Sequence, residues 1–163
     1  MKRANVVRRA LDATKLGVRY RLGNGGMNPA AKSPADAKGL CDCSGFTAWV
    51  LGFPRLVKDP FYLRAAGGWV NTTSIVKDAD DPRGFFQRVA LKDALPGDLI
   101  VFPWSGGKPG HVGVITQVKG GQLRVVHCSP RNERMGLSAI AETGPAAFER
   151  RDTIIARYTG LED

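Results

Sequence analysis

Apolar residues repeat with a helical period in the first part of the chain and with a strand-like pattern in the last part. Within residues 5–16 one set recurs at intervals of three and four, which predicts a short amphipathic helix with that face buried. Its members are Val7, Ala10, Leu11 and Thr14. Gly17 ends the pattern, and residues 21–39, rich in Gly, Pro, Ala and Lys, indicate a loop.

A second helix is predicted to begin at Cys43, because apolar residues recur from there at intervals of three, four and seven. The residues on its buried face are Phe46, Trp49, Val50 and Phe53. Asp42 has a side chain suited to cap the first turn, and Gly52 followed by Pro54 marks the end. Residues 54–92 have a mixed pattern that favours neither helix nor strand.

After the turn Pro96-Gly97-Asp98, the pattern becomes that of strands. The predicted strands are Leu99–Phe102, His111–Val118, Gln122–His127 and Thr153–Tyr158. Helices that precede strands indicate an α+β fold. Since the sequence contains no internal repeat and its length suits one compact unit, we expect a single domain over residues 1–163.

The charge is strongly positive and unevenly distributed. The net charge is +9, and residues 1–40 hold nine Lys or Arg against Asp12 and Asp36. Such a region favours association with a polyanion, whether nucleic acid, anionic lipid or acidic wall polymer, although an ordinary solvated surface explains it as well. No apolar run approaches the roughly 20 residues that cross a bilayer, so we expect no membrane span.

The chain has three cysteines, an odd number, and Cys41 and Cys43 are too close together to staple a fold. A free thiol is therefore expected rather than a disulfide framework. Cys43 stands at a predicted helix start, where unpaired backbone N–H groups and the helix dipole favour a thiolate. Gly45 would let another backbone come close. A buried structural cysteine has the same pattern, so the nucleophile is one of two interpretations.

Both histidines of the chain, His111 and His127, lie in one predicted hairpin. Nucleophilic catalysis generally combines a nucleophile, a base and a third polar group that orients the base. Each histidine alone is equally consistent with a structural role. Together with a cysteine at a helix start they predict a Cys43, His111 and His127 site.

The hairpin loop decides whether the histidines share a face, because strand side chains alternate between faces. A two-residue loop, Gly120-Gly121, would place them on opposite faces. A three-residue loop that begins at Lys119 would instead pair Gly113 with His127 and set both imidazoles on one face. We therefore predict an odd-length loop or a bulge, with the histidine-bearing face turned towards Cys43.

Four motifs, in order along the chain, resemble those of the NlpC-type cell-wall peptidases, which are small papain-like cysteine endopeptidases. They are Asp42-Cys43-Ser44-Gly45-Phe46, Pro96 to Phe102, His111 to Ile115 and Val125-Val126-His127. The segment Gly17-Val18-Arg19-Tyr20, followed by Gly25-Gly26, is also similar to that family's approach to its cysteine. The resemblance covers most of residues 5–128. It implies a papain-like α+β fold, with N-terminal helices and a nucleophile-bearing helix start packed on an antiparallel sheet.

The resemblance also implies roles for the matching residues. Cys43 corresponds to the nucleophile, His111 to the general base and His127 to the residue that orients the base. The other matches are Tyr20, near the oxyanion, and Asp42 and Ser44, which line the substrate pocket. In that family such an acidic residue can recognise the free amine of a stem peptide. The implied activity, with no cofactor, is hydrolysis through a Cys thioester of the D-glutamyl–diamino acid bond in bacterial peptidoglycan.

The chain also departs from the family pattern. Residues 54–92 are longer than the usual link, and we expect them to form an insert that shapes the substrate site. We expect no separate wall-binding module, so the basic N-terminal region or a partner protein is expected to bind the wall. Arg8, Arg9 and Asp12 interrupt any signal-like apolar stretch. We thus expect action at the cell wall after lysis or after export without such a signal, as for a phage-type or secreted effector enzyme, and otherwise a cytoplasmic location.

Three other interpretations remain open. Soft ligands could hold zinc, although their spacing matches no common zinc motif; they are Cys41, Cys43, His111, His127 and Cys128. A nucleic-acid-binding module would use the basic charge, but Tyr20 is the one aromatic residue in the first 40, where stacking platforms would be needed. A papain-like amidase or acyltransferase could use the same thioester on another substrate.

Overall fold

The computed structural model describes residues 1–81 and 84–162. The helices are α1 (Arg3–Ala13), α2 (Cys43–Val50), α3 (Pro60–Ala66), α4 (Thr72–Ala79) and α5 (Pro130–Arg134), with 3-10 turns η1 (Leu91–Asp93) and η2 (Pro145–Phe148). The strands are β1 (Arg19–Tyr20), β2 (Leu40–Cys41), β3 (Phe86–Val89), β4 (Leu99–Phe102), β5 (His111–Lys119), β6 (Gln122–Cys128), β7 (Ile140–Thr143) and β8 (Ile154–Tyr158). Helices therefore dominate the first half of the chain and strands the second, as the α+β prediction required.

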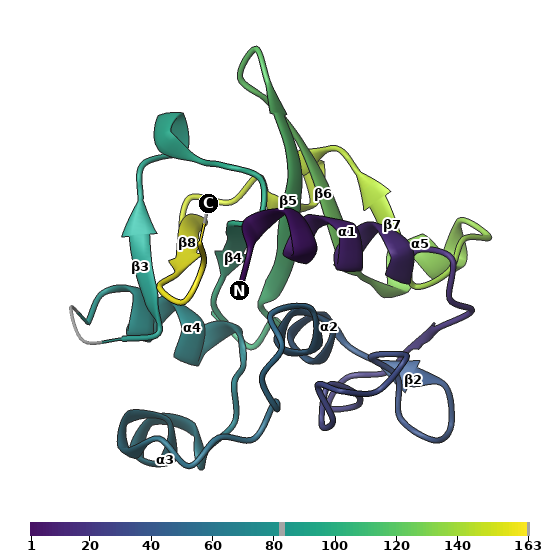
Figure 1. Cartoon of the computed structure of the whole chain (residues 1–163), viewed down its shortest axis with the longest axis horizontal. Helices are drawn as coiled ribbons and strands as arrows, with labels where there is room; N and C mark the ends of the chain where they lie inside the picture. The colour runs from purple at the N-terminus through teal and green to yellow at the C-terminus, as the bar shows by residue number, and fades with distance from the viewer. Residues whose placement is uncertain (82–83, 163) are drawn as a thin grey trace.

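One antiparallel sheet forms the centre of the described part of the chain. Its strand order is β3-β8-β4-β5-β6-β7, and each neighbouring pair is antiparallel. The short strands β1 and β2 pair with each other in parallel. Helices α1 and α2 lie across one face of the sheet, α4 packs against β3, β4 and β8, and α3 lies against α4 (Figure 1). The two chain termini are adjacent, since the Met1 amino group donates to the Gly160 carbonyl.

The sheet separates two hydrophobic clusters. The larger one fills the space between the sheet and helices α1 and α2, and it includes Val112, Val114 and Cys43. The smaller one lies on the other face and is closed by Phe148 of η2. This division follows from strand alternation, because neighbouring residues of β5 point to opposite faces.

The second helix is confirmed at the predicted residue, but the first helix is rotated from its predicted position. Helix α1 buries Val6, Ala10 and Ala13, whereas Leu11 is 38% exposed. The face predicted from Val7, Ala10, Leu11 and Thr14 is thus wrong in part. Small side chains at positions 10 and 13 allow the helix to approach the sheet closely, and this packing overrides the preference to bury the larger leucine.

The segment between α2 and β3 forms two helices that the sequence pattern did not assign. Asp59 caps α3 through its side chain and Pro60 stands at the first helical position. Asn71 caps α4 in a reciprocal capping box with Ser74. These two helices extend the structure beside the start of α2.

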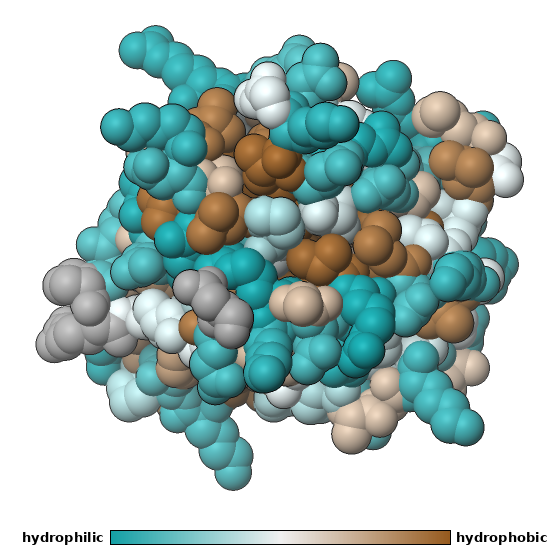
Figure 2. Space-filling model, turned by 45° about the horizontal axis from the view of Figure 1, so that its top comes forward, coloured by the Kyte–Doolittle hydropathy of each residue, from teal (hydrophilic) through white to brown (hydrophobic). Residues whose placement is uncertain are grey.

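Figure 2 shows a face on which long polar side chains surround small apolar areas. In the part of the chain that the structure describes, none of the helices has the length and apolar character needed to cross a bilayer.

Candidate active site

Cys43 is the first residue of α2, and local chemistry fixes that helix start. The Asp42 carboxylate accepts from the backbone N–H of Gly45 and so caps the helix, as predicted. Gly45 is in close contact with the backbone of Gly25, where a Cβ atom would lie 2.8 Å from the Gly25 carbonyl oxygen. The predicted close approach at Gly45 is therefore confirmed. The cysteine is held on a rigid, buried helix rather than on a loop.

The buried Asp42 carboxylate accepts hydrogen bonds at both of its oxygens. Its Oδ1 accepts from Gly45 N and the Ser44 hydroxyl, and its Oδ2 accepts from Gly23 N and Arg55 Nη2, the last at 2.6 Å. A carboxylate oxygen offers two lone pairs, so both oxygens are saturated. Asp42 and Ser44 do line the pocket of Cys43, but a substrate amine could bind Asp42 only by displacing one of these partners.

Arg55 is a component of the site that the sequence did not reveal. Its side chain is 5% exposed, and it also donates to the Ser44 hydroxyl and the Asn24 carbonyl. Nothing in the local sequence indicates this role, because its partner Asp42 lies thirteen residues earlier and belongs to another element. The buried pair ties the insert to the turn that carries the nucleophile.

Replacing Arg55 with leucine should lower the unfolding free energy by about 3–5 kcal/mol, because the Asp42 carboxylate would remain buried without its partner. Arg88→Leu is the matched control, since its ion pair with Asp80 is about half exposed and should contribute about 1 kcal/mol or less. Urea denaturation of the three proteins measures both values. Equal losses of unfolding free energy in the two variants would show that the buried pair stabilises the fold no more than the exposed pair does.

The histidine hairpin has a register that confirms the predicted bulge and contradicts the predicted loop. Lys119 pairs with Gln122, so the loop is the two residues Gly120-Gly121, both with positive φ, and the three-residue loop is wrong. A bulge between Ile115 and Gln117 then shifts the pairing by one residue. Beyond the bulge Val114 pairs with Val126. A three-residue loop without a bulge would have given this same pair, so the side chains face the same way as that loop predicted.

As a consequence the histidines meet on one face of the sheet. His111 Nε2 lies 2.7 Å from His127 Nδ1. Phe148 stacks on the His111 ring and contacts the His127 ring edge to face. This face is not the one that packs on α2, so the prediction that the histidine-bearing face turns towards Cys43 fails along the body of the hairpin.

Cys43 instead approaches the hairpin at its end. The register of β5 with β6 runs to the pair Val114 and Val126, although both strands continue beyond it. Next to His111, the backbone N–H of Val112 donates to the sulfur of Cys43. The structure thus brings the nucleophile to the strand residue that follows the predicted base. It shows no Cys43–His111 hydrogen bond among the described residues, and such contacts are often long before substrate binds.

All three groups of the predicted site are neutral at rest. Burial, followed by the Asp42 charge, raises the pKa of Cys43 to about 12. Burial, and then the His127 ring, lowers the pKa of His111 to about 3. Burial also lowers the pKa of His127 to about 4. Burial therefore favours the neutral thiol at this helix start.

The hydrogen bonds of the neutral histidines define their tautomers. The Thr143 hydroxyl donates to the Gly144 carbonyl, so its oxygen must accept from His127 Nε2–H, 3.0 Å away. Neutral His127 then has a lone pair on Nδ1, which accepts from His111 Nε2–H. Neutral His111 is left with its lone pair on Nδ1, and that nitrogen can serve as a base. Thr143, on the unpredicted strand β7, was missed by the sequence analysis.

Acid should destabilise the fold through these histidines. Between about pH 6.5 and pH 4 the unfolded chain binds protons that the folded chain excludes, so stability falls as the pH decreases through that window. We expect a loss of about 2 kcal/mol per histidine at about pH 5 relative to pH 7, measured by urea denaturation. His127→Gln should show a clearly smaller pH effect, and an unchanged effect would contradict a neutral His127.

Tyr20 lies beside this site. It pairs with Cys41 in the short parallel ladder, two residues before the nucleophile, and its backbone N–H donates to Glu133. Burial raises its pKa above the ordinary range, with the neighbouring Cys43 and Asp42 adding to the rise. Its hydroxyl therefore stays protonated near neutral pH and can donate a hydrogen bond.

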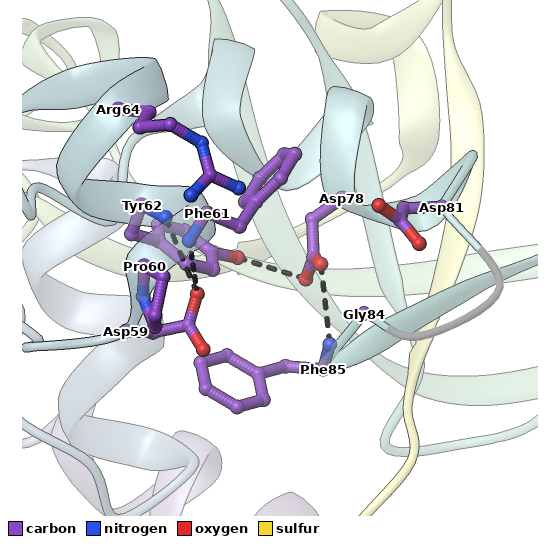
Figure 3. A pocket seen from close by; sticks show the side chains of 9 residues that line it. All are labelled: Asp59, Pro60, Phe61, Tyr62, Arg64, Asp78, Asp81, Gly84 and Phe85. Carbon is purple, nitrogen blue, oxygen red and sulfur yellow. Dashed lines mark hydrogen bonds between the residues drawn. The ribbon is translucent and has the colours of Figure 1, made fainter.

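A pocket of about 480 Å³ opens next to Cys43. The residues that line it come from the loop after β1, from the start of α2, from the insert and from the loop after β4. A separate pocket between α3 and α4 has no catalytic candidate: Figure 3 shows Tyr62 donating to the buried Asp78, an interaction that joins the two helices. Among the described residues, no three His, Cys, Asp or Glu side chains gather closely enough to share a metal ion.

The fold is that of a papain-like α+β protein of the NlpC/P60-like type. Residues 34–129, more than half of the chain, match the family model of the CHAP domain, and the chain belongs to this family. It thus carries a cysteine peptidase or amidase domain of the peptidoglycan-hydrolase type. The finer bond specificity is a separate question.

Among solved structures, the chain is similar to a lipoprotein of the NLP/P60 family from Staphylococcus aureus. The match covers 99% of this chain and 42% of that protein, with a TM-score of 0.50 and 19% sequence identity. The chain thus spans less than half of that protein, and the likeness is one of fold. No curated protein matches the sequence significantly.

Proposed function

We propose that this chain hydrolyses an amide bond in the stem peptides of bacterial peptidoglycan, with Cys43 as nucleophile and His111 as base. The observation that carries the proposal is the hydrogen-bonded series Thr143–His127–His111, which leaves a basic nitrogen next to the strand residue that contacts the Cys43 sulfur. The D-glutamyl–diamino acid bond is the finer proposal, taken from the NlpC-type resemblance.

The proposed reaction begins with a neutral thiol. Because the Cys43 pKa is raised to about 12, proton transfer to His111 Nδ1 accompanies attack of the sulfur on the substrate carbonyl. Backbone N–H groups at the start of α2 and the Tyr20 hydroxyl stabilise the developing oxyanion. His111 then gives its proton to the leaving amine, and a thioester remains. Water, deprotonated by His111, hydrolyses the thioester and restores the thiol.

Asp42 has a supporting role in this proposal. Its carboxylate holds Arg55 and the start of α2, so it positions the nucleophile rather than reading a substrate amine. The basic N-terminal region remains a candidate contact for acidic wall polymer. Several of its basic residues are exposed: Lys2, Arg8, Lys15, Arg19, Arg21, Lys32 and Lys38.

Thr143→Val should lower kcat about tenfold with little change in KM, because His127 would lose the acceptor that fixes its tautomer. Thr143→Ser keeps the hydroxyl and should restore most of the rate. Steady-state kinetics of the two variants test this prediction. A similar loss in both would indicate a packing defect instead of a positioning role.

Purified peptidoglycan tests the proposed function itself. The wild-type chain should release soluble fragments and generate new free amino groups, measured with an amine-reactive reagent. New reducing sugar ends without new amines would mean glycosidic cleavage and would contradict the proposal. Absence of any released fragment from walls of several chemical types would contradict it as well.

A further inference from the structure

One wall of the pocket next to the nucleophile is built by the insert. Seven of the lining residues come from the end of α3 to the first turn of α4: Ala65, Ala66, Trp69, Asn71, Thr72, Thr73 and Ser74. Trp104, from the loop after β4, completes that side. The insert therefore lines the candidate site, as expected, and these are the side chains through which it does so.

Two tryptophans stand at this wall with large exposed surfaces. Trp69 is 37% exposed and Trp104 is 51% exposed. The Arg55 guanidinium carbon lies 5.1 Å from the centre of the Trp69 ring, which supports that ring from within the protein. The backbone N–H of Trp104 donates to Thr73 Oγ1, which ties the loop to α4. Both indoles are thus positioned by specific contacts although nothing in the described chain covers them completely.

Hydrogen-bonding groups lie beside the indoles. Asn71 uses its side-chain oxygen to cap α4, so its amide nitrogen can donate to a ligand. Thr73 accepts from Trp104 and keeps its hydroxyl proton for donation. Thr72 lines the same pocket, and its hydroxyl makes no hydrogen bond within the described part of the chain. These groups are neutral.

The pocket presents no uncompensated charge. The charged side chains that line it within the described residues are Asp42 and Arg55, and they neutralise each other in one buried ion pair. A charged ligand group would find no counter-charge here, and a purely aliphatic one would leave the hydroxyl and amide donors unpaired. The wall suits a neutral ligand with an apolar face and polar edges.

We propose that this wall is a sugar-binding subsite for one N-acetylated pyranose of the glycan strand. The C–H face of a pyranose can lie on an indole, as apolar surfaces do on aromatic rings, while its hydroxyl and acetamido groups meet Asn71, Thr72 and Thr73. The proposal rests on the proposed function and narrows it: the preferred substrate is a stem peptide still attached to its sugar.

Two soluble substrates test the subsite: a stem peptide that carries the disaccharide of N-acetylglucosamine and N-acetylmuramic acid, and the same peptide with an acetyl group in place of the sugar. Wild-type kcat/KM should be higher for the glycosylated substrate by about tenfold or more. Trp69→Ala and Trp104→Ala should each lower kcat/KM much more for the glycosylated substrate than for the acetylated peptide, and so remove most of that preference. Trp104→Phe should retain part of it.

Leu137→Ala is the matched control, since Leu137 is 48% exposed and lies outside the pocket; its preference should equal that of the wild type. Equal rates on the two substrates would overturn the subsite and leave the proposed function standing. Hydrolysis of neither substrate, nor of whole peptidoglycan, would instead be a failure of the proposed function. If all variants lose activity on both substrates, binding of the free disaccharide to the Cys43→Ala protein decides, and no binding overturns the subsite.

Discussion

Cys43→Ala is expected to reduce the rate of peptidoglycan hydrolysis by at least about 10³-fold, because the mechanism has no other nucleophile. The fold should persist, since alanine fits the first position of α2 and the cap from Asp42 to Gly45 does not involve the thiol. Release of soluble wall fragments measures the rate, and thermal unfolding checks the fold.

The other two thiols provide matched controls. Cys41 and Cys128 are both free and fully buried, and the Cys128 thiol donates to the Cys41 carbonyl. Cys128→Ala should lower stability without a comparable loss of turnover per folded molecule. Full activity in Cys43→Ala would refute the mechanism, and an equal loss of turnover from Cys41→Ala would show that the effect is not specific to the nucleophile.

His111→Ala should lose about 10- to 100-fold more activity than His127→Ala, because the base moves the proton whereas its partner only orients the base. His127→Gln should lose less than His127→Ala, because an amide oxygen can still accept from His111 Nε2. Measurement of kcat/KM for the three variants gives the order. Comparable losses from the two alanine variants, or a larger one at His127, would mean that the two roles are assigned wrongly.

The helix at Cys43 could be predicted because its signals are local. Asp42 supplies the cap, the apolar residues repeat with a helical period, and Gly52 and Pro54 follow its end. The same kind of signal marks the insert, where Asp59 precedes Pro60 and Asn71 precedes Ser74 by three positions. Helices α3 and α4 were not predicted, because the apolar residues of this segment do not repeat with a clear helical period, although the cap residues were present in the sequence.

In the hairpin, local sequence rules predict the turn but not the bulge. Gly120-Gly121 forms the two-residue turn that such a pair favours, and the predicted register is reached only through the bulge before Gln117. A bulge depends on packing against both neighbouring strands, which the hairpin sequence alone does not specify. The prediction that both histidines lie on one face is therefore confirmed through the bulge, whereas the predicted three-residue loop is wrong.

Hydrogen-bond partners that are distant in the sequence could not be predicted from it. Arg55 becomes part of the site through Asp42, and Thr143 becomes part of it through His127, in each case across elements that meet only in the folded chain. A polar residue in a loop or a short strand has many possible partners. Its role becomes definite when the fold selects one of them.

Product identification by mass spectrometry, on a defined peptidoglycan fragment incubated with the wild type and with Cys43→Ala, tests the central claim most directly. The account predicts two products from the wild type, a new carboxylic acid and a new amine whose masses together exceed the fragment by one water, and intact fragment with Cys43→Ala. Cleavage at the same bond by both proteins, or cleavage by the wild type at a glycosidic bond, would contradict it.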